Sequence, residues 1–350
     1  MFYRTDDLRI RRTEVVVPPV VLEQEFPETD AASSTIYHSR QQILEILRGE
    51  DRRLLVVVGP CSIHDPKAAR EYGGLLKGSI SELCESLHIV MRVYFEKPRT
   101  TVGWKGLLND PYLDQSFKIN EGLRLARRLL LDLAEMGVPA GTEFLDMITP
   151  QYLAGLVSWG AIGARTTESQ VHRQLVSGLS CPVGFKNATS GDTHVAIEAV
   201  LSAAEPHTFL GHTKEGQTAI FVTTGNADCH VILRGGRKAV NYGAGAVGQV
   251  CRQLKEAGLV PRVMVDCSHA NSNKDYTKQA GVCRDVAQQI ENGSKDIFGV
   301  MLESNLVAGT QKLSSGRLLV YGQSITDGCM GWQETLELLR ELAAAVRKGR

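Results

Sequence analysis

A cysteine that directly follows an apolar run is the first residue whose setting suits chemistry. The run LLVVV at 54–58 leads into GPCSIHD, in which Cys61 comes right after Gly59 and Pro60. A cysteine of the protein core needs no such setting, whereas a metal ligand or a nucleophile does. The choice between these roles depends on which other residues occupy similar positions.

Three further residues with metal-ligand atoms stand at or beyond the ends of apolar runs. His269 follows RVMVDCS, Glu303 follows FGVML, and Asp327 lies beyond the last run in GQSITDGC. With Cys61 they offer a thiolate, an imidazole and two carboxylates, a set that suits Mn, Fe, Co or Zn and suits Mg or Ca poorly. These residues lie far apart in the sequence, so a metal site requires a fold that brings them together.

A second group of residues near the ends of these runs is basic. Its members are Arg92, Lys97, Arg99, Arg165, Lys186 and Arg234. Converging cations call for a strongly anionic ligand, such as two phosphates and a carboxylate, because arginine binds these groups bidentately. Beside a metal that polarises a carbonyl, they indicate an aldol-type condensation of phosphorylated substrates.

The chain alternates between short apolar runs and helical patterns. The runs, with the polar residues that end them, are LLVVVGPCS, HIVMRVYFEKPR, PAGTEFLD, GAIGARTTE, CPVGFKNAT, CHVILRGG, RVMVDCSH and FGVMLES. Eight strand–helix units predict a (β/α)8 TIM barrel of the α/β class, with a doubly wound open sheet as the alternative. In a barrel the carboxyl ends of all strands meet at one mouth, where both groups of residues would converge.

Two segments fall outside the barrel pattern. Residues 1–50 are predicted to form an N-terminal extension whose helical pattern ends near Gly49, and 51–350 to form the catalytic barrel. Within the barrel, HTFLGHTKEGQTAIFVTTGNAD at about 207–228 predicts an inserted β-hairpin. Barrel chemistry needs neither segment, so both are candidates for regulation or oligomerisation.

Two motifs point to other functions. GAGAVG at 243–248 matches the dinucleotide fingerprint, with Asp266 beyond it, and favours a nicotinamide oxidoreductase. The polar stretch RKAVNY separates it from the preceding strand, so we interpret it as a glycine-rich helix start. Lys186 also fits the Schiff-base lysine of a metal-free aldolase. A sugar-phosphate sensor without catalysis is a further alternative.

Composition limits which binding partners and which cellular compartment we expect. Lys+Arg and Asp+Glu both number 39, so the formal net charge is zero, which argues against nucleic acid or an anionic membrane as the main partner. The N-terminus lacks the apolar region of a secretory signal, and no run has the roughly 20 apolar residues of a membrane span. The 8 cysteines show no CxxC spacing, which favours reduced thiols and a cytoplasmic protein.

Several motifs together resemble one enzyme family. GPCSIHD, MRVYFEKPRTTVGWKG, AIGARTTESQ, PVGFKN, HVILRGG, VDCSHANSNK and YGQSITD are similar to motifs of the feedback-regulated class I 3-deoxy-D-arabino-heptulosonate 7-phosphate (DAHP) synthases of bacteria and fungi. The resemblance runs from about Asp6 to the end of the last helical pattern. It implies condensation of phosphoenolpyruvate with erythrose 4-phosphate and release of phosphate, the first step of the shikimate pathway to aromatic amino acids. It also implies a divalent metal ion and no organic cofactor.

The resemblance assigns roles to individual residues. Cys61, His269, Glu303 and Asp327 resemble the metal ligands of the family. The residues that resemble its phosphoenolpyruvate site are Arg92, Lys97, Arg165, Lys186 and Arg234. Arg99 and Thr100 resemble the residues that hold the aldose phosphate. Lys97 is the expected proton donor, either alone or together with a metal-bound water, and Cys61 and His269 complete the catalytic set. The loop GFKNATSGD departs from the common GFKNGTDG at Ala188 and Ser190, which affects only local loop geometry.

The extension and the hairpin match the family's regulatory parts, which implies a homodimer or homotetramer inhibited by an aromatic amino acid. The candidate inhibitor-binding residues are Asp7, Ile10, Phe144, Gln151, Leu175, Leu179, Phe209 and Gly211. Phe-sensitive members carry serine where this chain has Gly211, which leaves room for a para hydroxyl. We therefore expect tyrosine as the inhibitor, with phenylalanine or tryptophan as the alternatives.

Overall fold

The computed structural model describes residues 3–99, 103–313 and 318–349. Eight parallel strands of these residues close into a barrel in the order β1-β10-β9-β8-β5-β4-β3-β2. The strands are β1 (Leu54–Gly59), β2 (Leu87–Arg92), β3 (Ala140–Glu143), β4 (Trp159–Ile162), β5 (Val183–Lys186), β8 (Cys229–Leu233), β9 (Val263–Asp266) and β10 (Ile297–Glu303). The predicted (β/α)8 barrel is confirmed, and the open sheet is excluded because β1 pairs with both β2 and β10.

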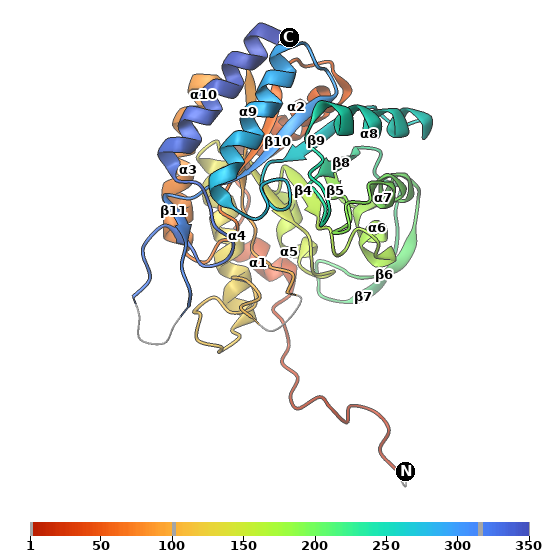
Figure 1. Cartoon of the computed structure of the whole chain (residues 1–350). Coiled ribbons are helices and arrows are strands. Elements are labelled where there is room, and N and C mark those ends of the chain that lie inside the picture. The colour runs from red at the N-terminus through yellow and green to blue at the C-terminus, as the bar shows by residue number, and fades with distance from the viewer. Residues whose placement is uncertain (1–2, 100–102, 314–317, 350) are drawn as a thin grey trace.

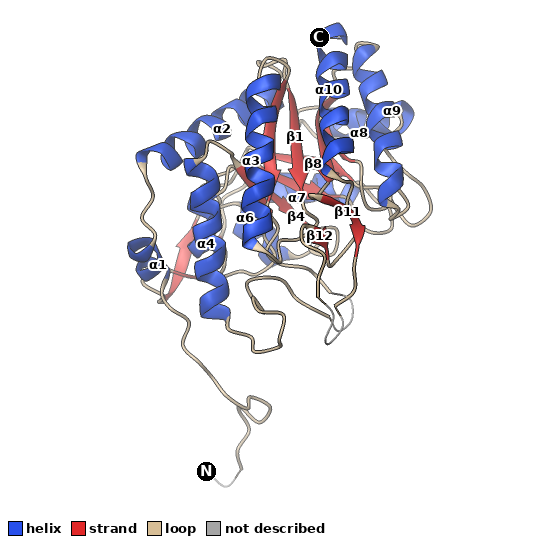
Figure 2. Cartoon of the chain, turned by 90° about the vertical axis from the view of Figure 1, so that its left-hand side faces the viewer, coloured by secondary structure: helices blue, strands red, loops and turns tan. Residues whose placement is uncertain are grey.

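Helices surround the barrel (Figure 1, Figure 2). They are α3 (Pro66–Leu83), α4 (Ile119–Glu135), α5 (Pro150–Leu153), α6 (Gln170–Val176), α7 (His194–Ala204), α8 (Ala244–Glu256), α9 (Gln279–Glu291) and α10 (Trp332–Gly349), with 3-10 turns η1 (Ala154–Leu156) and η2 (Tyr276–Lys278). The first strand–helix unit, β1 and α3, shows why these residues form a strand and a helix. Every residue of β1 is buried. Beyond it, the Asp65 side chain accepts hydrogen bonds from the backbone N–H groups of Lys67 and Ala68, and Pro66 occupies the first turn of α3.

The second half of the N-terminal extension is packed against the barrel. It contains α1 (Pro19–Glu25) and α2 (Asp30–Arg48), and α2 ends at Gly49, as its helical pattern predicts. Ile43 and Ile46 of α2 share a buried cluster with side chains of the barrel interior. Arg262, just before β9, donates to the backbone oxygen of Ile46. Helix α2 therefore covers the amino-terminal end of the barrel, opposite the mouth. The division at residue 50 stays a prediction.

The predicted hairpin is present as β6 (Thr208–His212) and β7 (Thr218–Val222), which pair antiparallel. The rings of Phe209 and Phe221 lie edge to face on it, with centroids 5.9 Å apart. A short pair of strands, β11 (Val307–Thr310) and β12 (Gln323–Ser324), follows β10 and was not predicted.

The glycine-rich motif at 243–248 begins a helix, as we interpreted it. Gly243 caps α8, and β8 ends ten positions earlier at Leu233. The dinucleotide fingerprint requires its glycines at the end of a strand, so the motif does not support a nicotinamide site. Among the described residues, no helix is both long and apolar enough to cross a membrane.

Candidate active site

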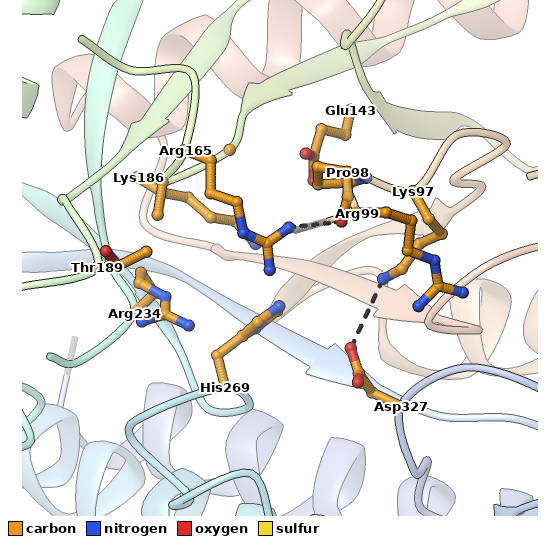
Figure 3. Close-up of a pocket in the computed structure, with 12 residues that line it drawn as sticks. Lys97, Pro98, Arg99, Glu143, Arg165, Lys186, Thr189, Arg234, His269 and Asp327 are labelled. Carbon is orange, nitrogen blue, oxygen red and sulfur yellow. Dashed lines mark hydrogen bonds and ion pairs between the residues drawn. The ribbon is translucent and has the colours of Figure 1, made fainter. Parts of the chain in front are cut away.

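The carboxyl ends of the strands surround a cavity of about 120 Å³ at the barrel mouth (Figure 3). The residues that line it are Lys97, Pro98, Arg99, Glu143, Gly163, Ala164, Arg165, Lys186, Thr189, Arg234, His269 and Asp327. Cys61, Arg92 and Glu303 lie buried next to this lining. Except for Thr100, which lies outside the described residues, the structure thus brings both predicted groups to one mouth.

Three of the predicted metal ligands form a compact cluster. One ligand atom each from Cys61, Glu303 and Asp327 lies within 4.8 Å of the other two. The fourth, His269, has Nε2 3.8 Å from Oε1 of Glu303. A thiol, an imidazole and two carboxyl groups this close together fit a divalent transition metal.

The orientation of His269 also fits a ligand. Its Nδ1 lies 2.9 Å from Oδ2 of Asp266, which leaves Nε2 facing the cluster. A carboxylate on one ring nitrogen is the usual partner of a metal-binding histidine, because it fixes the ring. His269 has a φ of 56°, and its carbonyl accepts a hydrogen bond from Lys274 N at 2.6 Å. A non-glycine residue with positive φ is strained, and such strain is typical of functional sites.

Glu303 is held by groups that leave Oε1 on the side of the cluster. Ser268 Oγ donates to Oε2 at 2.7 Å, and Arg92 Nη2 donates to Oε1 at 3.0 Å. The Gln279 side chain bonds both the N–H and the carbonyl of Glu303. Burial raises the pKa of Glu303, but His269, Arg92 and Lys97 outweigh burial and hold the pKa below its ordinary value.

The Lys97 ammonium lies among the ligand atoms. Nζ is 3.0 Å from Sγ of Cys61 and 3.7 Å from Oδ2 of Asp327. Burial lowers the pKa of Lys97, but Cys61 and Glu303 outweigh it, so the pKa is raised above its ordinary value. Burial and the charge of Glu303 raise the pKa of Cys61 to about 11. Lys97 is therefore a cation beside the ligand cluster.

The remaining cations surround the open part of the cavity. Lys186 Nζ pairs with Oδ2 of Asp266 at 3.0 Å, and both residues are buried. A Schiff-base lysine needs an amine that is free to attack a carbonyl, so the pairing with Asp266 argues against the metal-free aldolase. Arg165 donates to the Pro98 carbonyl at 2.5 Å, and Arg99 donates to the Trp104 carbonyl at 2.8 Å.

Arg234 is positioned through the loop that departs from the common family motif. The Asn187 side chain accepts a hydrogen bond from the Arg234 N–H at 2.8 Å. Beyond Asn187, a turn is closed by bonds from Ala188 N to the Asp192 carbonyl and from Gly191 N to the Ala188 carbonyl. The altered residues are thus confined to the turn.

Our sequence reasoning included Glu143, Asp266 and Ser268 in neither the metal-ligand group nor the basic group. Glu143 ends β3, is buried and lines the cavity, and its Oε1 has no hydrogen-bond partner within the described part of the chain. Asp266 ends β9 and contacts both His269 and Lys186. The signal for Glu143 and Asp266 was their place at a strand end. Ser268 carries no such signal, because a serine in a loop is ordinary.

The candidate inhibitor residues are only partly brought together. Phe144 and Leu175 are buried in the main core, and Leu179 packs against that core. The Gln151 carbonyl accepts a hydrogen bond from Lys214 in the hairpin turn. Asp7 and Ile10 lie on the segment that extends away from the barrel (Figure 1). Within one chain they do not join the others.

The space at Gly211 is already occupied. A Cβ at Gly211 would lie 3.0 Å from Cε2 of Phe221. The Phe221 ring therefore fills the room that we expected for a para hydroxyl, and the argument for tyrosine loses its basis.

The fold and the cavity define a (β/α)8-barrel enzyme with a cationic site beside a group of metal-ligand atoms. Residues 25–340 match the family model described as the DAHP synthetase I family. The chain belongs to this family.

Individual relatives agree with this membership. The chain is 61% identical to the Phe-sensitive phospho-2-dehydro-3-deoxyheptonate aldolase of Escherichia coli strain K12, over 100% of both chains. It is 53% identical to the Trp-sensitive enzyme of Salmonella typhimurium, over 98% of both. A solved structure of the aldolase from Francisella tularensis superposes with a TM-score of 0.96 at 55% identity, over 97% of this chain and 99% of that one. These names do not confirm the preference for tyrosine and favour its alternatives.

Proposed function

We propose that the chain condenses phosphoenolpyruvate with erythrose 4-phosphate to DAHP and phosphate, the first step of the shikimate pathway. The single observation that carries the proposal is the cavity in which a cationic lining meets a thiol–imidazole–carboxyl cluster. Two phosphorylated substrates and one carbonyl that must be polarised require this combination.

In the proposed reaction, Arg165, Lys186 and Arg234 bind the carboxylate and phosphate of phosphoenolpyruvate, and Arg92 stabilises the buried carboxylate of Glu303. Arg99, with Thr100, holds the phosphate of erythrose 4-phosphate. A divalent metal ion held by Cys61, His269, Glu303 and Asp327 would supply Lewis-acid polarisation of the aldehyde. Mn, Fe, Co and Zn all fit a donor set with one thiolate.

The proposed bond changes are those that the resemblance to the DAHP synthases implies. C3 of phosphoenolpyruvate attacks the aldehyde carbon, and Lys97 Nζ donates a proton to the developing alkoxide. Water adds at C2, and phosphate leaves with cleavage of the C–O bond. Glu143 and Lys186, which line the same cavity, are suited to hold that water.

A phosphate-release assay with both substrates tests the function. We expect release that stops on metal removal with EDTA and returns when Mn or Co is added. Cys61→Ser should lose most metal binding and activity, whereas Cys84→Ser, a change at an exposed cysteine at the end of α3, should lose neither. Full activity after complete metal removal would falsify the ligand assignment, and absence of phosphate release would favour a sensor.

We propose phenylalanine as the feedback inhibitor. The Phe-sensitive relative is the more similar of the two sensitivity classes, and the Phe221 ring removes the argument for tyrosine. Phosphate release measured with each aromatic amino acid separately should fall most with phenylalanine. Strongest inhibition by tyrosine or tryptophan, or insensitivity to all three, contradicts the proposal.

We further propose that the chain forms a homodimer or homotetramer in the cytoplasm. The hairpin exposes Leu210, Ile220 and Val222 at 73%, 70% and 77%, which is unusual for three neighbouring apolar side chains. The distant segment with Asp7 and Ile10 would reach the hairpin of a second copy. The described cysteines are all unpaired, which supports a reducing compartment.

A further inference from the structure

The ring of Tyr276 lies between the two loops that carry His269 and Asp327. It belongs to the turn η2, which follows the loop after β9, and with those two residues it lines a second cavity of about 80 Å³. On the other side the ring faces two glycines of the segments after β10. A Cβ at Gly328 would lie 2.5 Å from Cδ1 of Tyr276, and one at Gly309 would lie 3.6 Å from its hydroxyl oxygen.

The position of Asp327 depends on its backbone more than on its side chain. The side chain is 66% exposed, and its contacts are the long ones to Lys97 and Cys61. The backbone just after it is fixed on one side, because Cys329 exchanges two hydrogen bonds with Gly309 and Met330 N donates to the Glu303 carbonyl. The Tyr276 ring contacts this backbone from the other side, at the glycine next to Asp327.

Tyr276 is in turn placed by the loop that presents His269. That loop contains three non-glycine residues in the left-handed region, with φ of 56° at His269, 55° at Asn273 and 59° at Lys274. The hydrogen bond from Lys274 N to the His269 carbonyl closes it. Asp275 then caps η2 through the N–H of Thr277. A shift of this loop therefore moves the histidine and the tyrosine ring together.

We propose that Tyr276 is a positioning residue that sets the distance between His269 and Asp327 by packing its ring on Gly328. This inference rests on the proposed metal site. The ring carries the effect, because the atoms nearest to a Cβ at Gly328 are Cδ1, Cγ and Cβ of Tyr276 and not its hydroxyl oxygen. Only glycine permits this contact, because a methyl group at position 328 would overlap the ring.

Four variants of the full-length protein, titrated with Co²⁺ after metal removal, test the proposal. Tyr276→Ala and Gly328→Ala should each weaken cobalt binding by about 10–100-fold, the range for residues that orient metal ligands. Both should also alter the visible absorption of the bound cobalt, which reports its ligand geometry. Tyr276→Phe should bind cobalt as the parent protein does.

Gly331→Ala is the matched control. It lies three positions from Gly328 in the same segment, yet its Cβ would meet Ala308 at an ordinary 3.4 Å. It should leave both the affinity and the spectrum unchanged. Thermal unfolding of each apo protein shows whether a variant folds. If Tyr276→Ala or Gly328→Ala does not fold, the cobalt titration of the other one tests the proposal.

Unchanged cobalt affinity and spectrum in both Tyr276→Ala and Gly328→Ala overturn the inference. Equal loss in Tyr276→Phe also overturns it, because the hydroxyl and not the ring would then matter. If the parent protein binds cobalt and releases phosphate while these variants behave normally, the proposed function stands without the inference. A parent protein that binds no cobalt overturns both.

Discussion

At the scale of single residues, the site depends on charges held at short range in a buried place. Arg92 and Lys97 compensate the carboxylate of Glu303, and the Lys97 ammonium also lies close to the Cys61 thiol. Removal of one partner from such a buried group leaves an uncompensated charge, which costs more than the pair contributes. Single substitutions here should therefore act on chemistry and metal binding together. Residues outside the ligand cluster allow tests in which the chemistry changes and metal binding does not.

Glu143 is one such residue. Glu143→Gln keeps the shape of the side chain and removes its basicity, so the turnover number should fall by about 10²–10⁴-fold, the usual effect of losing a general base. The KM values and cobalt affinity should change little, because Glu143 is outside the ligand cluster. Steady-state kinetics check this, with Glu168→Gln, an exposed residue, as the control. A turnover number near that of the parent protein contradicts the role.

Glu96 makes stability depend on pH. Burial, with Asp146 nearby, raises the pKa of Glu96 to about 7, and its contact is a hydrogen bond from Thr149 Oγ1 at 3.2 Å. A folded pKa above the unfolded value means that the neutral form is favoured in the fold. This contribution is fully present below the unfolded pKa and is lost as pH rises through about 7.

Glu96→Gln should therefore raise the thermal midpoint at pH 8, and the gain should shrink steadily as the pH is lowered below 7. Thermal unfolding of both proteins across this range measures the difference. A gain that is independent of pH, or a loss at pH 8, means that Glu96 is ionised without penalty in the fold.

At the scale of elements, α2 and the hairpin have different roles, although both lie outside the eight strand–helix units of the barrel. Helix α2 covers the amino-terminal end of the barrel with Ile43, Ile46 and Leu47, which are buried. A barrel interior filled with side chains still needs a cover at this end, because apolar residues would otherwise face water. The hairpin instead exposes apolar side chains.

Ile46→Ala tests the cover. It should reduce the free energy of unfolding by about 2–5 kcal/mol, the usual cost of truncating a buried isoleucine. Tyr37→Ala on the same helix should cost far less, because Tyr37 is 61% exposed. Denaturant unfolding of both variants gives the comparison. Equal effects of the two changes mean that α2 is only loosely associated with the barrel.

At the scale of the whole molecule, the described residues of the candidate active site meet within one chain, whereas the candidate inhibitor-binding residues do not. The segment with Asp7 and Ile10 leaves the barrel just before the point where the backbone at Val15 and Val17 bonds to the Asn120 side chain. Catalysis and inhibition should thus be separable by changes to this segment.

Deletion of residues 1–14 removes the segment and keeps the anchor at Asn120. The shortened protein should retain most of its turnover number and lose inhibition by phenylalanine. Sedimentation and phosphate-release assays with increasing phenylalanine check assembly and inhibition on the same preparation. Leu210→Ser is compared with the deletion, because it changes the hairpin side of the proposed contact between two chains. Unchanged inhibition after the deletion places the pocket elsewhere.

The barrel strands, and the side chains near their carboxyl ends, could largely be predicted from the sequence. All eight apolar runs form barrel strands, and the candidate side chains near their ends were grouped from residue type and position. These features are local, because the apolar run of a strand and the turn that ends it are formed by residues that are neighbours in the sequence. The pair β11–β12 was missed, since its few residues lack an apolar alternation strong enough to predict strands.

By itself, then, the sequence determined the barrel, the two groups of residues that meet at its mouth and the helix start at 243–248. Only the tertiary structure decided that Lys97 lies among the ligand atoms, that Asp266 serves both His269 and Lys186, and that Phe221 fills the space at Gly211. Those contacts join residues far apart in the chain. Their distances follow from closure of the barrel and the packing of whole side chains, neither of which any local pattern of residues specifies.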